Sequence, residues 1–202
     1  HHDSKADVQL ERFIFFSDAV FAICITLLVI EIKVPTLPEP TDHALLQYLS
    51  STSLKFFGFL LSFYIIGHYW IVHHRIFGYV KKSTGTLLWI NLAFLLTVIL
   101  LPFSSGLFGE YGSHINMDVP YLIYVLNMCL TGIVNCWLWV YVSNPKRDLL
   151  THIIPKERIH LGIVRSLIIP VVFIISLIVS LFFPVISRFI PLLIPLISNF
   201  GL

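Results

Sequence analysis

Residues 11–32 read ERFIFFSDAVFAICITLLVIEI, and this stretch decides the fold. From Phe13 to Val34 the chain is apolar for about the 20 residues that a helix needs to cross a bilayer core of about 30 Å. Asp18 lies well inside this run, where an ionised carboxylate costs about 2.5–3.5 kcal/mol on insertion scales. The stretch predicts a membrane-spanning helix in which Asp18 has a polar partner, either Arg12 or a donor on a neighbouring helix.

The composition of the whole chain is that of a membrane protein. Its 202 residues are 57% hydrophobic and 12% charged, with a mean hydropathy of +0.88, whereas soluble domains are about 25% charged. A formal net charge of +2 gives no basic field suited to a nucleic acid backbone. The three cysteines, Cys24, Cys129 and Cys136, lie in apolar runs and are odd in number, which argues against a disulfide framework.

Five further apolar runs follow the first, separated by turn-forming residues. The six predicted spans are 13–34, 54–72, 87–108, 119–142, 160–183 and 185–201. The last run is the weakest, because Arg188, Pro191 and Pro195 shorten or kink it, so five spans are an alternative count. The N-terminal segment has no cleavage signature, so we expect the first run to be retained. The pattern predicts an all-α integral membrane protein with one six-helix domain over residues 1–202.

The distribution of Lys and Arg predicts how the spans are oriented. With six spans, ten of the 13 basic residues lie on one side of the bilayer, and Lys33, Lys55 and Arg188 lie on the other. Basic residues resist translocation, so the side with ten is the cytoplasmic one. Both termini are then cytoplasmic, and an even number of spans fits this asymmetry better than five.

Helical geometry separates the carboxylate of the first run from an aliphatic stripe. The face of Asp18 also holds Ala22, Ile25 and Val29. The opposite face holds Ile23, Leu27, Ile30 and Val34. If Asp18 packs against other helices, the stripe faces lipid, another subunit or a pore axis, with lipid as the default. Thr26 beside the stripe is a candidate hydroxyl ligand, although a Thr in a membrane helix commonly bonds its own backbone.

A second polar cluster, IIGHYWIVHHRIFGYVKK, occupies residues 65–82 at the end of the second span. Imidazoles bind Zn²⁺, so His68, His73 and His74 raise the hypothesis of a metal-dependent membrane enzyme. However, His73 and His74 point about 100° apart on a helix, and neither Cys nor a carboxylate is near in sequence. We therefore favour a role in which one of these histidines and the Trp70 indole N–H donate to Asp18.

The fourth span carries a polar stripe, in which Asn127, Thr131 and Asn135 follow one another at a spacing of four. Such seams usually join helices, and a water-filled path is the alternative. Asn91 and Arg165 are further candidates for internal bonding. The sequence contains no phosphate loop, no Ser–His–Asp set with intelligible spacing and no paired carboxylates suited to hydrolysis. We expect no enzymatic activity and no metal site.

Arg12, Phe16, Ser17 and Asp18 form the pattern R-x3-F-S-D, which resembles the signature of the transmembrane protein 175 family, the endolysosomal potassium channels and their bacterial relatives. Two further stretches agree with it. They are WIVHHRIF at 70–77, and Asn91 followed by the LPF of 101–103. The resemblance is specific over the first half of the chain and rests on the six-span pattern elsewhere. It implies a bacterial member with one six-helix repeat.

The resemblance implies a homotetramer in a lipid bilayer, in a bacterial plasma membrane, whose first helices line a central pore. On that alignment Ile23, Leu27 and Ile30 face the pore, and the position of Ile30 is often Leu in relatives. Thr26 and Glu31 are candidate pore-adjacent residues. The signature residues then form a supporting network rather than ion ligands. That network consists of Arg12, Phe16, Ser17 and Asp18, with the partners Trp70, His73 and Asn91.

The implied function is a potassium-permeable, leak-type cation channel that uses no cofactor and lacks a TVGYG filter. A ring of Ile23 side chains excludes water when it is narrow and conducts when it widens, so it acts as a hydrophobic gate. K⁺ loses its water more easily than Na⁺, which gives a modest preference among monovalent cations. The alternative from another class is a proton-coupled secondary transporter that uses Asp18.

Overall fold

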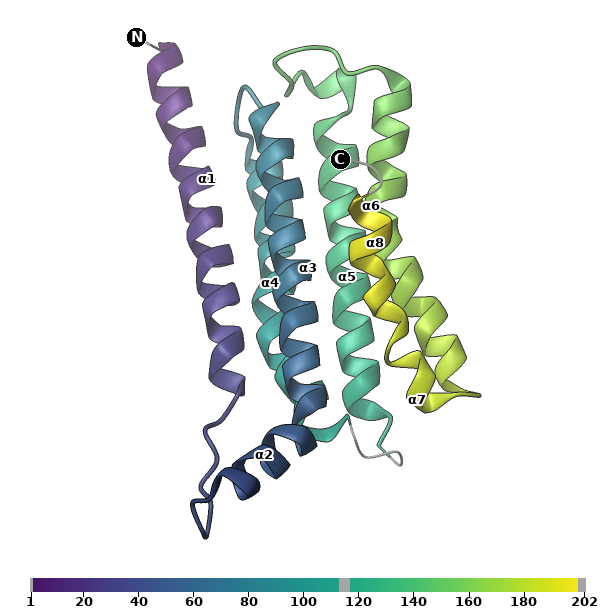
Figure 1. The fold of residues 1–202 in the computed structure, drawn as a ribbon. Coiled ribbons are helices and arrows are strands. Elements are labelled where there is room, and N and C mark those ends of the chain that lie inside the picture. Colours follow the sequence, from purple (N-terminus) through teal and green to yellow (C-terminus); the bar gives the residue numbers. More distant parts are fainter. Residues whose placement is uncertain (1, 113–116, 200–202) are drawn as a thin grey trace.

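The computed structural model describes residues 2–112 and 117–199, and their regular structure is helical apart from an isolated β-bridge. The long helices are α1 (His2–Leu27), α3 (Ser53–Gly78), α4 (Gly85–Tyr111), α5 (Val119–Val142) and α6 (Lys156–Ser180). The short elements are η1 (Leu28–Glu31), α2 (Asp42–Ser51), η2 (Pro145–Arg147), α7 (Pro184–Ser187), η3 (Ile190–Leu192) and α8 (Leu193–Asn199). The long helices run side by side as one bundle, with α1 at one edge and α6 towards the other (Figure 1).

Five helical segments are long and apolar enough to cross a membrane. They are Val8–Glu31, Ser53–Gly78, Gly85–Tyr111, Val119–Val142 and Lys156–Ser180. The prediction of a multi-pass, all-α membrane protein is therefore confirmed, and the first five predicted runs coincide with these segments to within a few residues. The sequence analysis did not foresee α2, a short helix between the first two spans.

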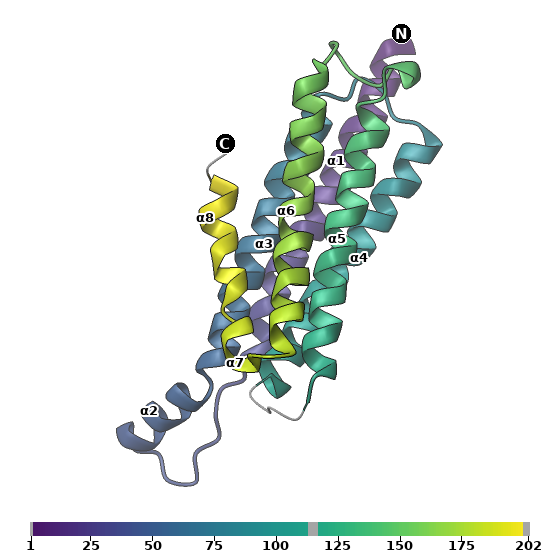
Figure 2. The ribbon, with the colours of Figure 1, turned by 90° about the vertical axis from the view of Figure 1, so that its right-hand side faces the viewer.

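The predicted sixth span, 185–201, is not one continuous helix. Its described part forms α7, η3 and α8, which turn back along α6 (Figure 2), and residues 200 and 201 lie outside the described residues. The apolar stretch Pro184–Ile197 is shorter than the five spans. Pro191 in η3 and Pro195 in the first turn of α8 lack the amide N–H that a continuous helix needs, so the helix is interrupted. The count of six spans is thus not confirmed.

The helix ends follow local sequence signals. The Thr41 side chain accepts a hydrogen bond from the Ala44 N–H (3.2 Å) and caps α2, and Thr84 caps α4 in the same way through the Leu87 N–H (3.2 Å). A proline in the first turn begins α5. These caps place the ends of the spans, so the polar loops lie at the two ends of the bundle.

The two ends of the bundle differ in charge. The start of α1, the end of α3, the turns from α3 to α4 and from α5 to α6, and the start of α6 lie at one end (Figure 1). These segments carry the ten basic residues that were predicted to share one side, and we call this the basic end. The loop to α2 and the turn from α6 into α7 lie at the other end.

An ion-pair cluster joins the two turns at the basic end. Asp148 pairs with Lys81 (2.6 Å) and with Lys82 (3.3 Å), and the Lys81 N–H donates to the Leu149 carbonyl (2.9 Å). Hydrogen bonds from the two lysines hold the pKa of Asp148 below its ordinary value. The cluster therefore persists at neutral pH and is lost only when the pH falls through that lowered pKa.

Small and polar residues join the central helices. Asn127 donates from Nδ2 to the Ser104 hydroxyl of α4 (3.0 Å), and Asn135 donates to the Ser166 hydroxyl of α6 (3.2 Å). Both asparagines are buried. The polar stripe on the fourth span thus joins α4, α5 and α6, which is the first of the two predicted interpretations.

Gly132 of α5 allows a close approach to Pro170 of α6. A Cβ added at this position would overlap the ring carbons of Pro170 and lie 3.0 Å from the Tyr69 hydroxyl. We expect Gly132→Ala to destabilise the protein by about 1–3 kcal/mol, since a rigid proline ring cannot move aside. Thermal unfolding in detergent measures the effect. Gly67→Ala is the matched control, because no atom lies within 4 Å of its added Cβ. Equal melting temperatures for the two variants would contradict this packing.

Candidate functional site

One face of α1 packs into the bundle. Its buried residues recur at spacings of three, four or seven along the helix. They are Leu10, Ser17, Phe21, Cys24 and Leu28, the last in η1. This spacing defines a single helix face, and that face meets α3 and α4.

The packed face is displaced by about one residue from the predicted one. Asp18 and Ile25 are only half-buried, and Ala22 and Val29 are exposed. Ser17 occupies the centre of the seam because its small hydroxyl fits between helices. The Asp18 carboxylate therefore lies at the edge of the seam. The face that Asp18 shares with Ala22, Ile25 and Val29 is therefore only partly covered by the rest of the described chain.

A chain of hydrogen bonds ties α1 to α4 and α3. The Asn91 Nδ2 of α4 donates to the Ser17 hydroxyl (2.9 Å), and the Asn91 Oδ1 bonds the His73 Nε2 of α3 (2.8 Å). Because Oδ1 accepts, His73 carries its proton on Nε2. Ser17 in turn donates to the Phe13 carbonyl (3.1 Å). All three polar side chains are buried, so each orders the next.

An aromatic cage surrounds the His73 ring. Its centroid lies 4.4 Å from that of Phe77, 5.5 Å from Phe21 and 5.9 Å from Phe94, and it stacks on Phe94. Phe21 belongs to α1 and Phe94 to α4. The imidazole is therefore held by packing from three helices as well as by Asn91.

Asp18 provides a second connection between α1 and α3. The Trp70 indole N–H donates to the Asp18 Oδ1 over 2.9 Å. Of the two predicted donors, Trp70 donates to Asp18. His73 bonds Asn91 instead, and Asn91 donates to Ser17. Within the described residues no hydrogen bond or ion pair joins Arg12 to Asp18. Arg12 and Phe16 are both exposed.

Among the described residues, the aliphatic stripe of α1 is left largely uncovered. Ile23 is 57% exposed, Leu27 42% and Ile30 66%. Thr26 beside them donates its hydroxyl to the carbonyls of its own helix, at 2.9 Å for Ile23 and 3.0 Å for Ala22. The face of α1 that carries Ser17, with Asp18 at its edge, is thus packed and hydrogen-bonded, and the aliphatic stripe on the other side is exposed in the single chain.

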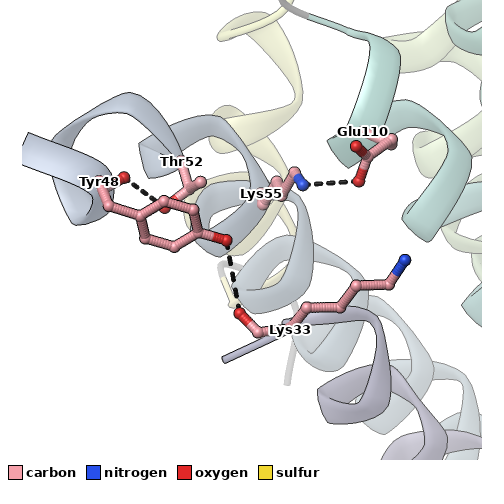
Figure 3. Close-up of polar contacts among 5 residues, drawn as sticks. All are labelled: Lys33, Tyr48, Thr52, Lys55 and Glu110. Carbon is pink, nitrogen blue, oxygen red and sulfur yellow. Dashed lines mark hydrogen bonds and ion pairs between the residues drawn. The ribbon is translucent and has the colours of Figure 1, made fainter. Parts of the chain in front are cut away.

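At the far end of the bundle, polar contacts tie α2 to the segment after η1 and α3 to α4 (Figure 3). The Tyr48 hydroxyl of α2 donates to the Lys33 carbonyl (3.5 Å), and the Lys55 ammonium of α3 pairs with Glu110 of α4 (2.6 Å). The Glu31 carboxylate lies against Gly106 of α4, where any Cβ would collide with it. No sequence signal pointed to these ties, because their partners lie 15 to 55 residues apart.

The three histidines of α3 have different surroundings. His73 is buried and His74 is exposed on the same helix, and His68 stacks on Tyr64. Across residues 2–112 and 117–199, no three His, Cys, Asp or Glu side chains are grouped so that they could hold a metal ion.

These features define a multi-pass helical membrane protein whose first helix is anchored on its polar face and bare on its apolar face. Residues 12–102 match the family model of the endosomal/lysosomal potassium channel TMEM175. Over these residues, which are a little less than half of the chain, the protein is similar to the TMEM175 family. The matched region contains the signature of α1 together with Trp70, His73 and Asn91.

The relatives include proteins named potassium channels and proteins named proton channels. A potassium channel of Chamaesiphon minutus is 36% identical over 132 residues, which are 65% of each chain. The human endosomal/lysosomal proton channel TMEM175 is 36% identical over 101 residues, which are 46% of this chain and 20% of that one. The aligned segments span 55–65% of the length of the bacterial relatives.

The fold also matches a solved structure. The crystal structure of a lysosomal potassium-selective channel TMEM175 homologue from Chamaesiphon minutus superposes with a TM-score of 0.78 at 28% identity. The match covers 95% of this chain and 99% of that one. The likeness therefore extends beyond the first half, over which the sequence signature is specific.

The Trp70–Asp18 bond can be tested by itself. Trp70→Phe keeps a large aromatic ring but leaves the carboxylate without its indole donor, so we expect a loss of about 1–3 kcal/mol. The measurement is thermal unfolding in detergent. Trp89→Phe is the control, because Trp89 is exposed on α4. A Trp70→Phe protein as stable as the Trp89→Phe protein would show that the bond contributes nothing.

Proposed function

We propose that this protein is a potassium-permeable, leak-type cation channel in which α1 of each subunit lines a central pore. The observation that carries the proposal is the division of α1 into a fastened polar face and a bare aliphatic face. The bacterial relatives are named potassium channels, and the superposed structure is that of a potassium-selective channel. A helix that binds the rest of its chain only through one face can present the other to a pore axis.

The proposed assembly is a homotetramer in a bacterial plasma membrane. One chain cannot enclose a pore with a single helix, so sister copies must supply the rest of the ring. The domain is taken as residues 1–202, with α7, η3 and α8 as the sixth membrane segment. The described part of that segment turns back from the far end along α6 (Figure 2), which supports a cytoplasmic location for both termini.

The proposed constriction is apolar. Side chains of Ile23, Leu27 and Ile30 from each copy would meet near the axis, and such rings exclude water when narrow. An ion that passes must shed part of its hydration shell, which favours K⁺ over Na⁺ without a carbonyl filter. The Thr26 hydroxyl proton already bonds its own backbone, so only its oxygen lone pairs are left to face a cation.

The far end of the bundle supplies an attractive field for cations. Glu31, Glu39 and Asp42 lie in or after η1 and at the start of α2, and Lys33 is the only basic residue in this stretch of chain. Acidic groups near a pore mouth raise the local cation concentration. In this proposal the Glu31 carboxylate attracts cations from its position beside Gly106 and does not lie on the pore axis.

The polar network acts as a support in this proposal. Ser17, Asn91 and His73 are buried and bonded to one another, and Asp18 is bonded to Trp70, so these side chains join α1 to α3 and α4. These bonds fix the rotation of α1 about its axis, and thereby the direction in which Ile23 points. The same bonds weigh against the transporter alternative, in which Asp18 would have to release its partner in each cycle.

The pore assignment is tested by ion flux from proteoliposomes that hold the purified full chain. We expect Ile23→Asn to raise flux about tenfold and to reduce the K⁺/Na⁺ preference, because a polar neck stays wet and a barrier lower by about 1.4 kcal/mol gives a tenfold rate. Ile174→Asn on α6 is the matched control, since Ile174 is 46% exposed against 57% for Ile23.

Other outcomes would assign the protein differently. Equal flux from the wild type, Ile23→Asn and Ile174→Asn would remove Ile23 from the pore. Saturable, proton-linked flux that disappears in Asp18→Asn and ignores Ile23→Asn would identify a transporter. Proton current without K⁺ flux would place the protein with the relatives that are named proton channels.

A further inference from the structure

A cavity of ≈ 460 Å³ lies between α3, α5 and α6 at the basic end. It is closed on one side by the segment that leads into α6, through His152, Ile154 and Pro155. It is separate from the candidate pore face, because none of its lining residues belongs to α1. The sequence analysis did not predict it, since its walls come from three helices that are distant in sequence.

Three arginines line this cavity and carry its charge. Arg75 comes from α3, and Arg158 and Arg165 come from α6. Within the described part of the chain none of these guanidinium groups has an ion pair, and no described lining residue is Asp or Glu. Glu157 is the nearest acid along α6 and does not line the cavity.

Other basic residues at the same end are already engaged. Lys81 and Lys82 are paired with Asp148, and the Arg147 guanidinium lies 3.6 Å from the centre of the Tyr141 ring. The three cavity arginines are therefore a distinct group. Three cations that converge on one cavity repel one another unless an anion lies between them.

Two polar groups in the cavity wall are buried without a hydrogen bond to any described residue. The Tyr69 hydroxyl and the Asn135 Oδ1 are buried and have no hydrogen-bond partner among the described residues. Both residues line the cavity. Buried polar atoms are almost always bonded, so these two point to a polar ligand or to bound water in the cavity.

Much of the remaining wall is apolar. Val72 and Ile76 of α3 line the cavity together with Ile168 and Ile169 of α6. The Trp139 indole is held by the Ile159 carbonyl (3.0 Å), and Gly162 leaves room for its ring, because any Cβ there would overlap it. A ligand in this cavity thus meets arginines and a hydrocarbon wall together.

The cavity also reaches into the depth of the membrane. His68 in its wall lies ten residues before the end of α3 at Gly78, which is about 15 Å at 1.5 Å per residue. Arg158 lies in the first turn of α6, at the level of the loops. The cavity therefore spans from the lipid headgroup level into the hydrocarbon.

We propose that this cavity is a binding site for an anionic phospholipid, with its phosphate on Arg75, Arg158 and Arg165 and the start of an acyl chain along the apolar wall. The guanidinium fork matches phosphate oxygens in geometry and charge. Basic pockets between membrane helices on the cytoplasmic side suit anionic headgroups. A free phosphate ion would satisfy the arginines and leave the hydrocarbon wall unused.

The test uses native mass spectrometry of the full chain in mixed micelles with two lipids of equal acyl chains. Phosphatidylglycerol is the anionic probe, and phosphatidylcholine carries the same phosphate with a balancing cation. We expect phosphatidylglycerol adducts to exceed phosphatidylcholine adducts about tenfold, and Arg158→Gln/Arg165→Gln to abolish the preference. Lys146→Gln/Lys156→Gln removes two charges from the same end outside the cavity and should retain the preference.

Each alternative outcome overturns the proposal. Equal binding of the two lipids would remove lipid selectivity, and a loss of preference in both double variants would reduce it to general surface charge. Displacement of phosphatidylglycerol by millimolar inorganic phosphate would identify a soluble anion site instead. Arg75→Gln, on a different helix, repeats the test if the α6 pair fails to fold, as judged by circular dichroism.

Discussion

The structure depends on the bonds that hold α1 against α3 and α4. Hydrocarbon offers no partner to a polar group, so Ser17 and Asp18 must bond within the protein. Asn91 donates a hydrogen bond to Ser17 and is itself bonded to His73, whereas Trp70 donates a hydrogen bond to Asp18. Two adjacent residues bonded to two different helices leave α1 with one rotation about its axis. That rotation decides which side chains of α1 pack against α3 and α4 and which remain exposed.

The opposite side of α1 is the consequence of this anchoring. Because Ser17 and Asp18 are bonded to α4 and α3, the aliphatic stripe on the other side of α1 is exposed. Its residues are among the exposed apolar side chains of the spans. In a bilayer such a face tolerates lipid, a sister subunit or a pore axis equally well, because apolar surface has no hydrophobic drive there. Similarity to channels over residues 12–102 favours the pore axis. The same division explains why the signature residues lie behind the stripe and not on it.

The two ends of the bundle have separate chemistry. The basic end combines a salt-bridged pair of turns with a cavity whose arginines are unpaired among the described residues, and the far end carries acidic residues around η1 and α2. The charge asymmetry that sets orientation during insertion thus also creates two different surfaces. At the far end, prolines break the last apolar run, so that it turns back beside α6 as short helices and not as one continuous helix.

The sequence by itself determined the membrane class, the five long spans, the charge asymmetry and the need of Asp18 for a partner, because length, hydropathy and the cost of a buried charge act locally. It also identified Trp70, His73 and Asn91, through the pattern they share with a family. Only the tertiary structure decided that Ser17 lies in the seam and Asp18 at its edge, that Arg12 stays outside, and that Arg75 and Arg165 share a cavity. These outcomes depend on which helices are neighbours and on how each helix is rotated. Contacts between residues more than 50 positions apart in sequence decide both.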